Sequence, residues 1–121
     1  MTVVVNAQVE GEELRLFVRD PVTAANCMNA KELLLNHVQK HPGPVVVVDL
    51  EQSPYIDTTA LAVLFDVKKQ VTQQGRSFFL QNPSRSVLRM LNLTRMNRIF
   101  SIRFAGDAPA AEPPKNDGGA S

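Results

Sequence analysis

The stretch VVVVDLEQSPYIDTTALAVLF, residues 45–65, passes from a strand to a helix through one short loop. Residues 45–50 form a continuous apolar run that is mostly β-branched, which is typical of a strand covered on both faces. A polar turn follows at 51–55, and from about 58 to 74 apolar side chains recur at helical spacing until Gly75. A buried strand followed at once by an amphipathic helix predicts an α/β fold with parallel pairing.

The segments on either side of this stretch continue the alternation. Two β-rich runs at 3–9 and 14–18, separated by a glycine-containing turn, predict an N-terminal hairpin. Asp20 is a good N-cap with Pro21 at the first helical position, so we expect a helix that starts there and stops at the Pro-Gly-Pro of 42–44. The remaining expected elements are a strand at 77–81, a short helix at 84–92 and a last edge strand at 98–103.

The element order is therefore ββαβαβα with a final β. It predicts an α/β domain with a mixed β-sheet of four to five strands, an N-terminal hairpin and three to four helices packed against the sheet. We expect this domain to span residues 1–104. Residues 105–121 are rich in Ala, Pro and Gly and contain no large hydrophobe, so we expect them to be disordered.

Composition indicates an ordinary soluble domain. The chain has 121 residues, 44% of them hydrophobic, with no apolar run of membrane-spanning length. It shows no secretory signal pattern at its N-terminus. Its single cysteine, Cys27, cannot form an internal disulfide and is expected to be a small buried hydrophobe. We therefore expect a cytoplasmic protein.

Charge is distributed unevenly although the net charge is only +1. Residues 1–66 hold nine acids and four bases, whereas residues 67–106 hold no acid and the eight bases Lys68, Lys69, Arg76, Arg85, Arg89, Arg95, Arg98 and Arg103. These bases are spread through amphipathic segments, which favours solvated faces. The other interpretation is a positive patch that steers an acidic partner. Nucleic acid is a weaker candidate because aromatic residues are scarce and no binding motif accompanies the arginines.

Metal and enzyme sites are not indicated. His37 and His41 are spaced to share a helix face, but no third ligand accompanies them. Asp49, Glu51 and Asp57 lie near the carboxyl end of the strand at 45–50, where α/β sheets place ligands. They lack an obvious base or oxyanion partner, so we interpret them as turn and capping residues. We expect no catalytic residue, no metal and no cofactor.

The sequence DTTAL, residues 57–61, has two interpretations. Either Asp57 or Thr58 caps the following helix by accepting hydrogen bonds from its free N–H groups. Alternatively, a threonine hydroxyl at the helix start is accessible for modification. A phosphate there would meet free N–H groups and the positive end of the helix dipole. It would also bring about −1.5 to −2 charges beside Asp57, enough to repel a docked partner.

Three segments together resemble the STAS domain family, and specifically its bacterial anti-sigma factor antagonists. VVVVDLEQSPYIDTTALAVL is similar to the family's strand, turn and helix, with the pattern apolar strand–D/N-L-x-x-[LV]-x-[FY]-[IM]-D-S-[ST]-G-L. FFLQNPSRSVLRMLNLTRMNRIFSI is similar to its later strand, Asn-Pro, short helix and final strand. DPVTAANC resembles the start of its first helix. The likeness spans roughly residues 3–104.

The resemblance implies a partner switch controlled by phosphorylation. In the family, an anti-sigma factor serine/threonine kinase phosphorylates the hydroxyl after the motif aspartate, and a cognate phosphatase removes the phosphate. The matching position is Thr58, and the implied partner-binding residues are Tyr55, Asp57, Thr58, Thr59 and Ala60. The chain would bind no nucleic acid directly and could form a homo-oligomer.

Two departures from the family pattern leave a second function open. The usual glycine after the hydroxyl pair is Ala60, whose methyl group is expected to crowd a partner at the loop. The usual Gly-Glu-Leu before the first helix is replaced by Phe17-Val18-Arg19. The alternative function is a constitutive STAS subunit of a stressosome-like or lipid-transporter complex, with no phospho-switch.

Overall fold

The computed structural model describes residues 3–104 and contains one five-stranded mixed sheet. β1 pairs antiparallel with β2, and β2 to β5 are parallel, in the order β1-β2-β3-β4-β5. The strands are β1 (Val5–Glu10), β2 (Glu13–Val18), β3 (Val45–Asp49), β4 (Ser77–Gln81) and β5 (Ser101–Arg103). The helices are α1 (Cys27–Lys40), α2 (Thr58–Gln73), α3 (Arg85–Leu93) and the short 3₁₀ helix η1 (Met96–Arg98). The predicted mixed sheet with an N-terminal hairpin is confirmed.

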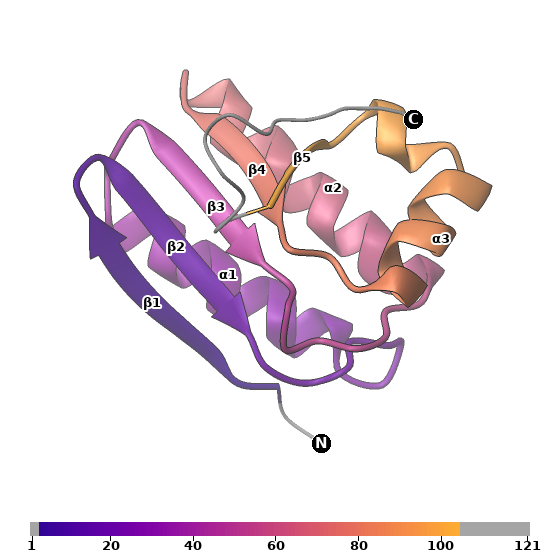
Figure 1. Ribbon diagram of the computed structural model, residues 1–121. Coiled ribbons are helices and arrows are strands. Elements are labelled where there is room, and N and C mark those ends of the chain that lie inside the picture. Colours follow the sequence, from indigo (N-terminus) through magenta and orange to yellow (C-terminus); the bar gives the residue numbers. More distant parts are fainter. Residues whose placement is uncertain (1–2, 105–121) are drawn as a thin grey trace.

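Both long helices cover the same face of the sheet (Figure 1). The strands follow each other in sequence order, so successive right-handed crossovers place their helices on one side. The hydrophobic core lies between that face and the helices, and it includes Leu16, Val48, Leu80, Leu34 and Val67, each at most 1% exposed. The carboxyl ends of the parallel strands therefore open onto the loops that lead into α1, α2 and α3.

The first helix begins six residues later than the sequence predicted. α1 starts at Cys27 and not at Pro21, because the intervening segment makes tertiary contacts instead. Val22 forms an isolated parallel bridge with Ile56. Asn26, which is buried, accepts a hydrogen bond from the Thr23 amide at 2.9 Å and donates one to the Pro21 carbonyl at 3.0 Å. These bonds hold residues 21–26 in a bridge and a turn, so the capping signal of Asp20 and Pro21 is overridden.

The face of the sheet turned away from α1 and α2 carries a connected set of polar side chains. Arg103 of β5 donates to both carboxylate oxygens of Glu13 in β2, at 3.0 and 2.7 Å. Its Nε donates to Gln81 at 2.8 Å, and Gln81 donates to the buried Asp49 at 2.9 Å. Because β3 and β4 lie between β2 and β5, Arg103 crosses two strands. Val47 on this face is also fully buried, so the prediction that β3 is covered on both faces is confirmed.

The last strand of the described chain is shorter than the expected strand at 98–103. β5 contains only residues 101–103, and η1 occupies 96–98 before it. Arg95 precedes η1 with a positive φ of 62°, which turns the chain out of α3. The expected disordered tail, residues 105–121, lies outside the described residues. No helix within residues 3–104 is long and apolar enough to cross a membrane.

Candidate functional site

The loop at 51–57 connects the end of β3 to α2 and is held on both sides. On one side Ser53, which is fully buried, donates a hydrogen bond through its hydroxyl to the Asp20 carbonyl at 2.8 Å. On the other side the hydroxyl of Ser84, the N-cap residue of α3, donates to the Pro54 carbonyl at 3.2 Å. The loop is thus positioned by the segments that precede α1 and α3.

Backbone hydrogen bonds fix the last residues of the loop. The Val22 amide donates to the Tyr55 carbonyl at 3.0 Å, and the Asp57 amide donates to the Val22 carbonyl at 3.1 Å. This short parallel bridge places Asp57 in an extended conformation (φ −102°, ψ −176°), as an N-cap residue requires. The start of α2 is therefore positioned by backbone hydrogen bonds to Val22 as well as by its local cap.

The Asp57 carboxylate joins the starts of two helical segments. One oxygen, Oδ1, accepts from the Ala60 amide at 3.0 Å and from the Thr59 hydroxyl at 2.5 Å. The other, Oδ2, accepts from the Ala24 amide at 2.9 Å, in the turn before α1. Of the two capping candidates in the sequence, Asp57 is therefore the cap, and Thr58 is the first residue of α2.

These hydrogen bonds also set the charge at the helix start. Burial alone would raise the pKa of Asp57, but the bonds from the Thr59 hydroxyl and from the amides of Ala60, Ala24 and Thr59 outweigh it and hold the pKa below the usual value of an aspartate. Asp57 is therefore ionised at neutral pH. A negative charge stands next to Thr58 before any modification takes place.

The two threonines are not equivalent. Both are exposed, but the Thr59 hydroxyl is committed to the Asp57 carboxylate. Within residues 3–104 the Thr58 hydroxyl makes no hydrogen bond. Capping needs one threonine hydroxyl and leaves the other accessible. An exposed hydroxyl at the first position of a helix is a group that a second protein can reach and modify.

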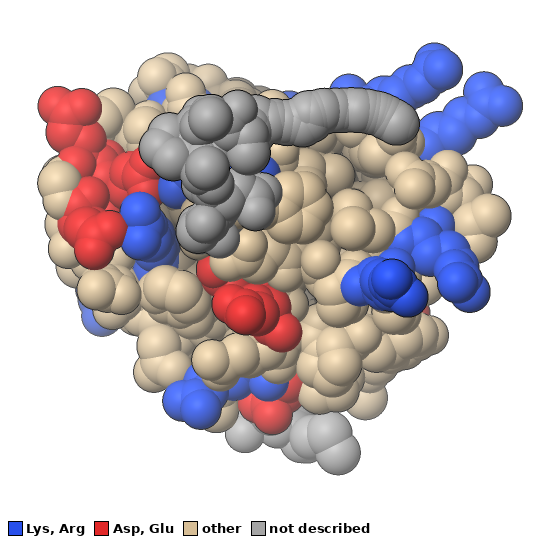
Figure 2. All heavy atoms as spheres, in the orientation of Figure 1, with Lys and Arg blue, Asp and Glu red and all other residues tan. Residues whose placement is uncertain are grey.

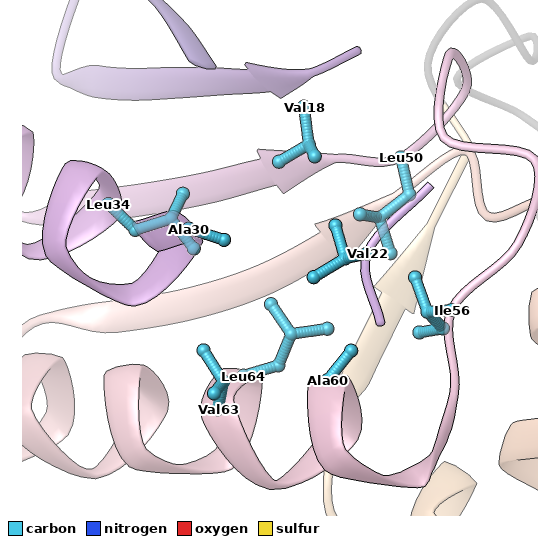
Figure 3. A pocket seen from close by; sticks show the side chains of 9 residues that line it. All are labelled: Val18, Val22, Ala30, Leu34, Leu50, Ile56, Ala60, Val63 and Leu64. Carbon is cyan, nitrogen blue, oxygen red and sulfur yellow. The ribbon is translucent and has the colours of Figure 1, made fainter. Parts of the chain in front are cut away.

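The other predicted partner-binding residues differ in exposure. Tyr55 is 46% exposed and lies two residues before Asp57. Ala60 is only 1% exposed, and its side chain points inward with that of Ile56 (Figure 3). The methyl group of Ala60 thus faces the core, contrary to the expectation that it crowds a partner at the loop.

A small apolar cavity lies directly beneath the start of α2 (Figure 3). Its volume is about 10 Å³, and its lining comes from β2, α1, α2 and the loop, including Leu50, Ile56 and Ala60. A void of this size holds at most one water molecule, and its lining offers such a water no polar partner. The space belongs to the packing of the core and is too small for an organic ligand.

The remaining acids and histidines of the sequence do not extend the site. Asp49 is 4% exposed and accepts hydrogen bonds from Gln81, Asn82 and the Glu51 amide, so it is a structural carboxylate inside the protein. The rings of His37 and His41 stack with their centroids 6.3 Å apart near the end of α1. In the part of the chain that is described, no three potential ligands are grouped to hold a metal ion.

Basic side chains gather around α3, next to the loop. Arg85, Arg89, Arg95 and Arg98 are all exposed. In Figure 2 blue side chains project from the side of the molecule where Figure 1 shows α3, whereas red side chains gather on the opposite side, over the β1–β2 hairpin. The hydrogen bond between Ser84 and Pro54 connects the start of α3 to the loop. The sequence asymmetry in charge is therefore also an asymmetry in space.

Several residues that position this site were not predicted from the sequence. Val22 and Ala24 contribute backbone groups, which carry no side-chain signal. Ser53 and Ser84 act through contacts between distant segments. The one available signal was the resemblance of the DPVTAANC segment to a helix start in the STAS family.

The sheet order, the helices on one face and the Asp-capped helix after β3 define a small α/β domain in which the loop at 51–57 follows the central strand. The family model of the STAS domain matches residues 4–107, most of the chain. The chain belongs to the STAS domain family.

Solved structures share this fold at low sequence identity. A candidate anti-sigma factor antagonist from Thermotoga maritima is 21% identical, with 88% of each chain covered and a TM-score of 0.75. An anti-sigma factor antagonist from Mycobacterium paratuberculosis is 13% identical, with 84% of this chain and 85% of that chain covered and a TM-score of 0.74. The phosphorylated form of the Bacillus cell fate determinant SpoIIAA is 9% identical, with 88% and 96% covered and a TM-score of 0.64.

Proposed function

We propose that this chain is an anti-sigma factor antagonist-like regulator that binds an anti-sigma factor kinase and is switched off by phosphorylation at Thr58. The observation that carries the proposal is that the two adjacent threonine side chains differ in their hydrogen bonding. Thr59 completes the Asp57 cap, and Thr58 presents an exposed hydroxyl without a hydrogen-bond partner in the described chain. The similar folds include anti-sigma factor antagonists, one of which was solved in phosphorylated and unphosphorylated forms.

In this function the chain is substrate and ligand, and the partner supplies the ATP. The Thr58 oxygen forms a bond to the γ-phosphorus of ATP, the bond to ADP breaks, and the hydroxyl proton passes to a base of the kinase. A cognate phosphatase hydrolyses the phosphothreonine with water. The binding surface consists of Tyr55, Asp57, Thr58 and Thr59, with the buried Ala60 fixing the first turn of α2 behind them.

The phosphate would act by charge at a preformed site. It would add about −1.5 to −2 charges next to the ionised Asp57. The positive end of α2 can tolerate this charge, because the N–H groups of the first helical turn point toward it. The domain therefore stays folded, while an acidic partner surface at the loop is repelled and an apolar one is disfavoured by the cost of desolvating the phosphate.

The test is a pull-down from the organism that makes this chain, with wild type, Thr58→Glu and Thr58→Val as baits. We expect wild type and Thr58→Val to retain an ATPase of the anti-sigma kinase type and Thr58→Glu to lose it. Thr59→Glu is unsuitable as a matched control because it removes a capping bond. Thr72→Glu, at an exposed position in the last turn of α2, serves instead. It should retain the partner.

The alternative function gives a different result in the same experiment. A constitutive subunit of a stressosome-like or lipid-transporter complex would retain one scaffold protein or transporter ATPase with all the baits. That outcome would remove the phospho-switch and leave the family assignment intact.

A further inference from the structure

The outer edge of β1 is an unprotected strand edge. β1 is the first strand of the sheet, and among residues 3–104 nothing pairs with its outer side (Figure 1). Five of its six residues are exposed, and Val9 is 57% exposed. The strand contains no lysine, no proline and no bulge, which are devices that keep such an edge from pairing, and its one charged residue, Glu10, lies at the end of the strand and is paired with Arg15.

The backbone groups that face outward can be assigned from the pairing with β2. The Arg19 amide donates to the Val4 carbonyl at 3.0 Å, and the Val4 amide donates to the Asp20 carboxylate at 3.2 Å, so the backbone groups of Val4 face the β2 side. In an antiparallel ladder the direction of these groups alternates, which turns the N–H and C=O groups of residues 6, 8 and 10 toward β2. The groups of Val5, Ala7 and Val9 consequently point away from the sheet.

The sequence of this edge is symmetric about Ala7. Residues 5–9 read Val-Asn-Ala-Gln-Val, apolar and amide side chains arranged in the same order from either end. An isologous two-fold contact needs such a self-complementary surface. If a second copy pairs antiparallel with the axis at Ala7, Val5 meets Val9, Ala7 meets Ala7, and Asn6 meets Gln8. No charged residue stands opposite a like charge in this pairing.

We propose that the chain forms a two-fold dimer through antiparallel pairing of β1 with β1 of a second copy, centred on Ala7. The two sheets then become one continuous sheet, and the outward N–H and C=O groups of Val5, Ala7 and Val9 are paired. The valine side chains lie on the same face of the sheet as α1, and that of Val9 is exposed there. Their pairing buries apolar surface that is otherwise in water.

This dimer leaves the candidate site free. β1 is at one edge of the sheet, and the loop at 51–57 follows the central strand β3. Because the two copies of β1 run in opposite directions, the two loops open at opposite ends of the joined sheet. Each subunit could then bind its own partner without contact between the two partners. The dimer does not depend on the proposed function at Thr58.

The first test is the mass of the full chain in solution, measured by sedimentation equilibrium over a wide concentration range. We expect wild type to associate to twice its 13.3-kDa mass. Ala7→Lys places two lysines directly opposite each other and should remain a monomer. The matched control Gln8→Lys adds the same charge on the neighbouring exposed residue, which faces Asn6 of the second copy, and should still dimerise. Circular dichroism checks that both variants are folded.

The second test measures the register. A cysteine at position 7 lies about 5.5 Å from its counterpart between Cα atoms, as in any hydrogen-bonded antiparallel pair. A cysteine at position 9 is four residues out of register with its counterpart, about 14 Å away at ~3.4 Å per residue. With a short thiol crosslinker, Ala7→Cys should give a covalent dimer and Val9→Cys should not.

Three results would overturn the proposal. One is a wild-type chain that stays monomeric at every concentration, and another is an Ala7→Lys chain that still dimerises. The third is crosslinking at position 9 as fast as at position 7, which would place the contact elsewhere.

Discussion

The Thr59 hydroxyl donates a hydrogen bond of 2.5 Å to the Asp57 carboxylate, so the cap of α2 is built from these two side chains. The same carboxylate accepts from the Ala24 amide at 2.9 Å and ties the turn before α1 to the start of α2. Thr58 stands between the two capping residues in sequence and takes no part in these bonds. A group at this position can be modified without breaking the cap directly.

The two threonines should differ in their effect on stability. We expect Thr59→Val to lower the free energy of unfolding by about 0.5–1.5 kcal/mol, because it removes one hydrogen bond and keeps the shape of the side chain. Thr58→Val, the matched control, should change it by less than about 0.5 kcal/mol. Urea unfolding of the two variants measures both values. A larger loss for Thr58→Val than for Thr59→Val would contradict the assignment of the cap.

Stability should depend on pH through Asp57. Its pKa is held below the usual value of an aspartate in the folded chain, so its contribution is complete at neutral pH and is lost as the pH falls through the folded pKa. Asp57→Asn should lower stability at pH 7 and should reduce the acid-dependent loss. Unfolding by urea from pH 7 down to about pH 3 provides the comparison. Parallel pH profiles for the two proteins would contradict this role.

Arg103 and Glu13 should be energetically coupled across the sheet. Two hydrogen bonds join them, and the bonds from Arg103 are the main reason that the pKa of Glu13 lies below its usual value. Both side chains are partly exposed, so we expect a coupling energy of only about 1 kcal/mol. A double-mutant cycle with Glu13→Gln and Arg103→Met measures it. Strictly additive losses would show that the pair does not stabilise the sheet.

Asn26 should be essential for the turn before α1. Asn26→Ala removes two part-buried hydrogen bonds, one from the Thr23 amide and one to the Pro21 carbonyl, which together we expect to cost about 1–3 kcal/mol. Asn36→Ala, on the exposed side of the same helix, is the control and should be close to neutral. Equal melting temperatures for the two variants would show that the turn is held by the backbone alone.

Much of the fold could be predicted from the sequence because its signals are local. The apolar run at 45–50 and the helical spacing after Thr58 report burial directly, and every predicted element except the first helix begins within about three residues of its predicted start. The start of α1 could not be predicted in the same way. Asp20 and Pro21 have the form of a helix start, but Asp20 accepts a hydrogen bond from the Val4 amide and from Ser53 instead. Such contacts between distant segments leave no trace in a local pattern.

The candidate site was predicted by position and not by geometry. Resemblance to the STAS family pointed to Thr58, but the sequence could not show which of two adjacent hydroxyls is used by the cap. That distinction depends on the direction of one side chain relative to the Asp57 carboxylate. The inward direction of Ala60 agrees with the helical spacing of the apolar residues after Thr58, and only the expectation that its methyl group crowds a partner was wrong.

The most direct measurement is the position of the phosphate on the chain. The wild-type protein is incubated with ATP and an extract of the cells that produce it, and its peptides are mapped by mass spectrometry, with Thr58→Val as the control. We predict a phosphate on Thr58 in the wild type and none on residues 57–61 in the control. A phosphate on Thr59, or an unmodified loop in an extract that phosphorylates other proteins, would contradict the proposed switch.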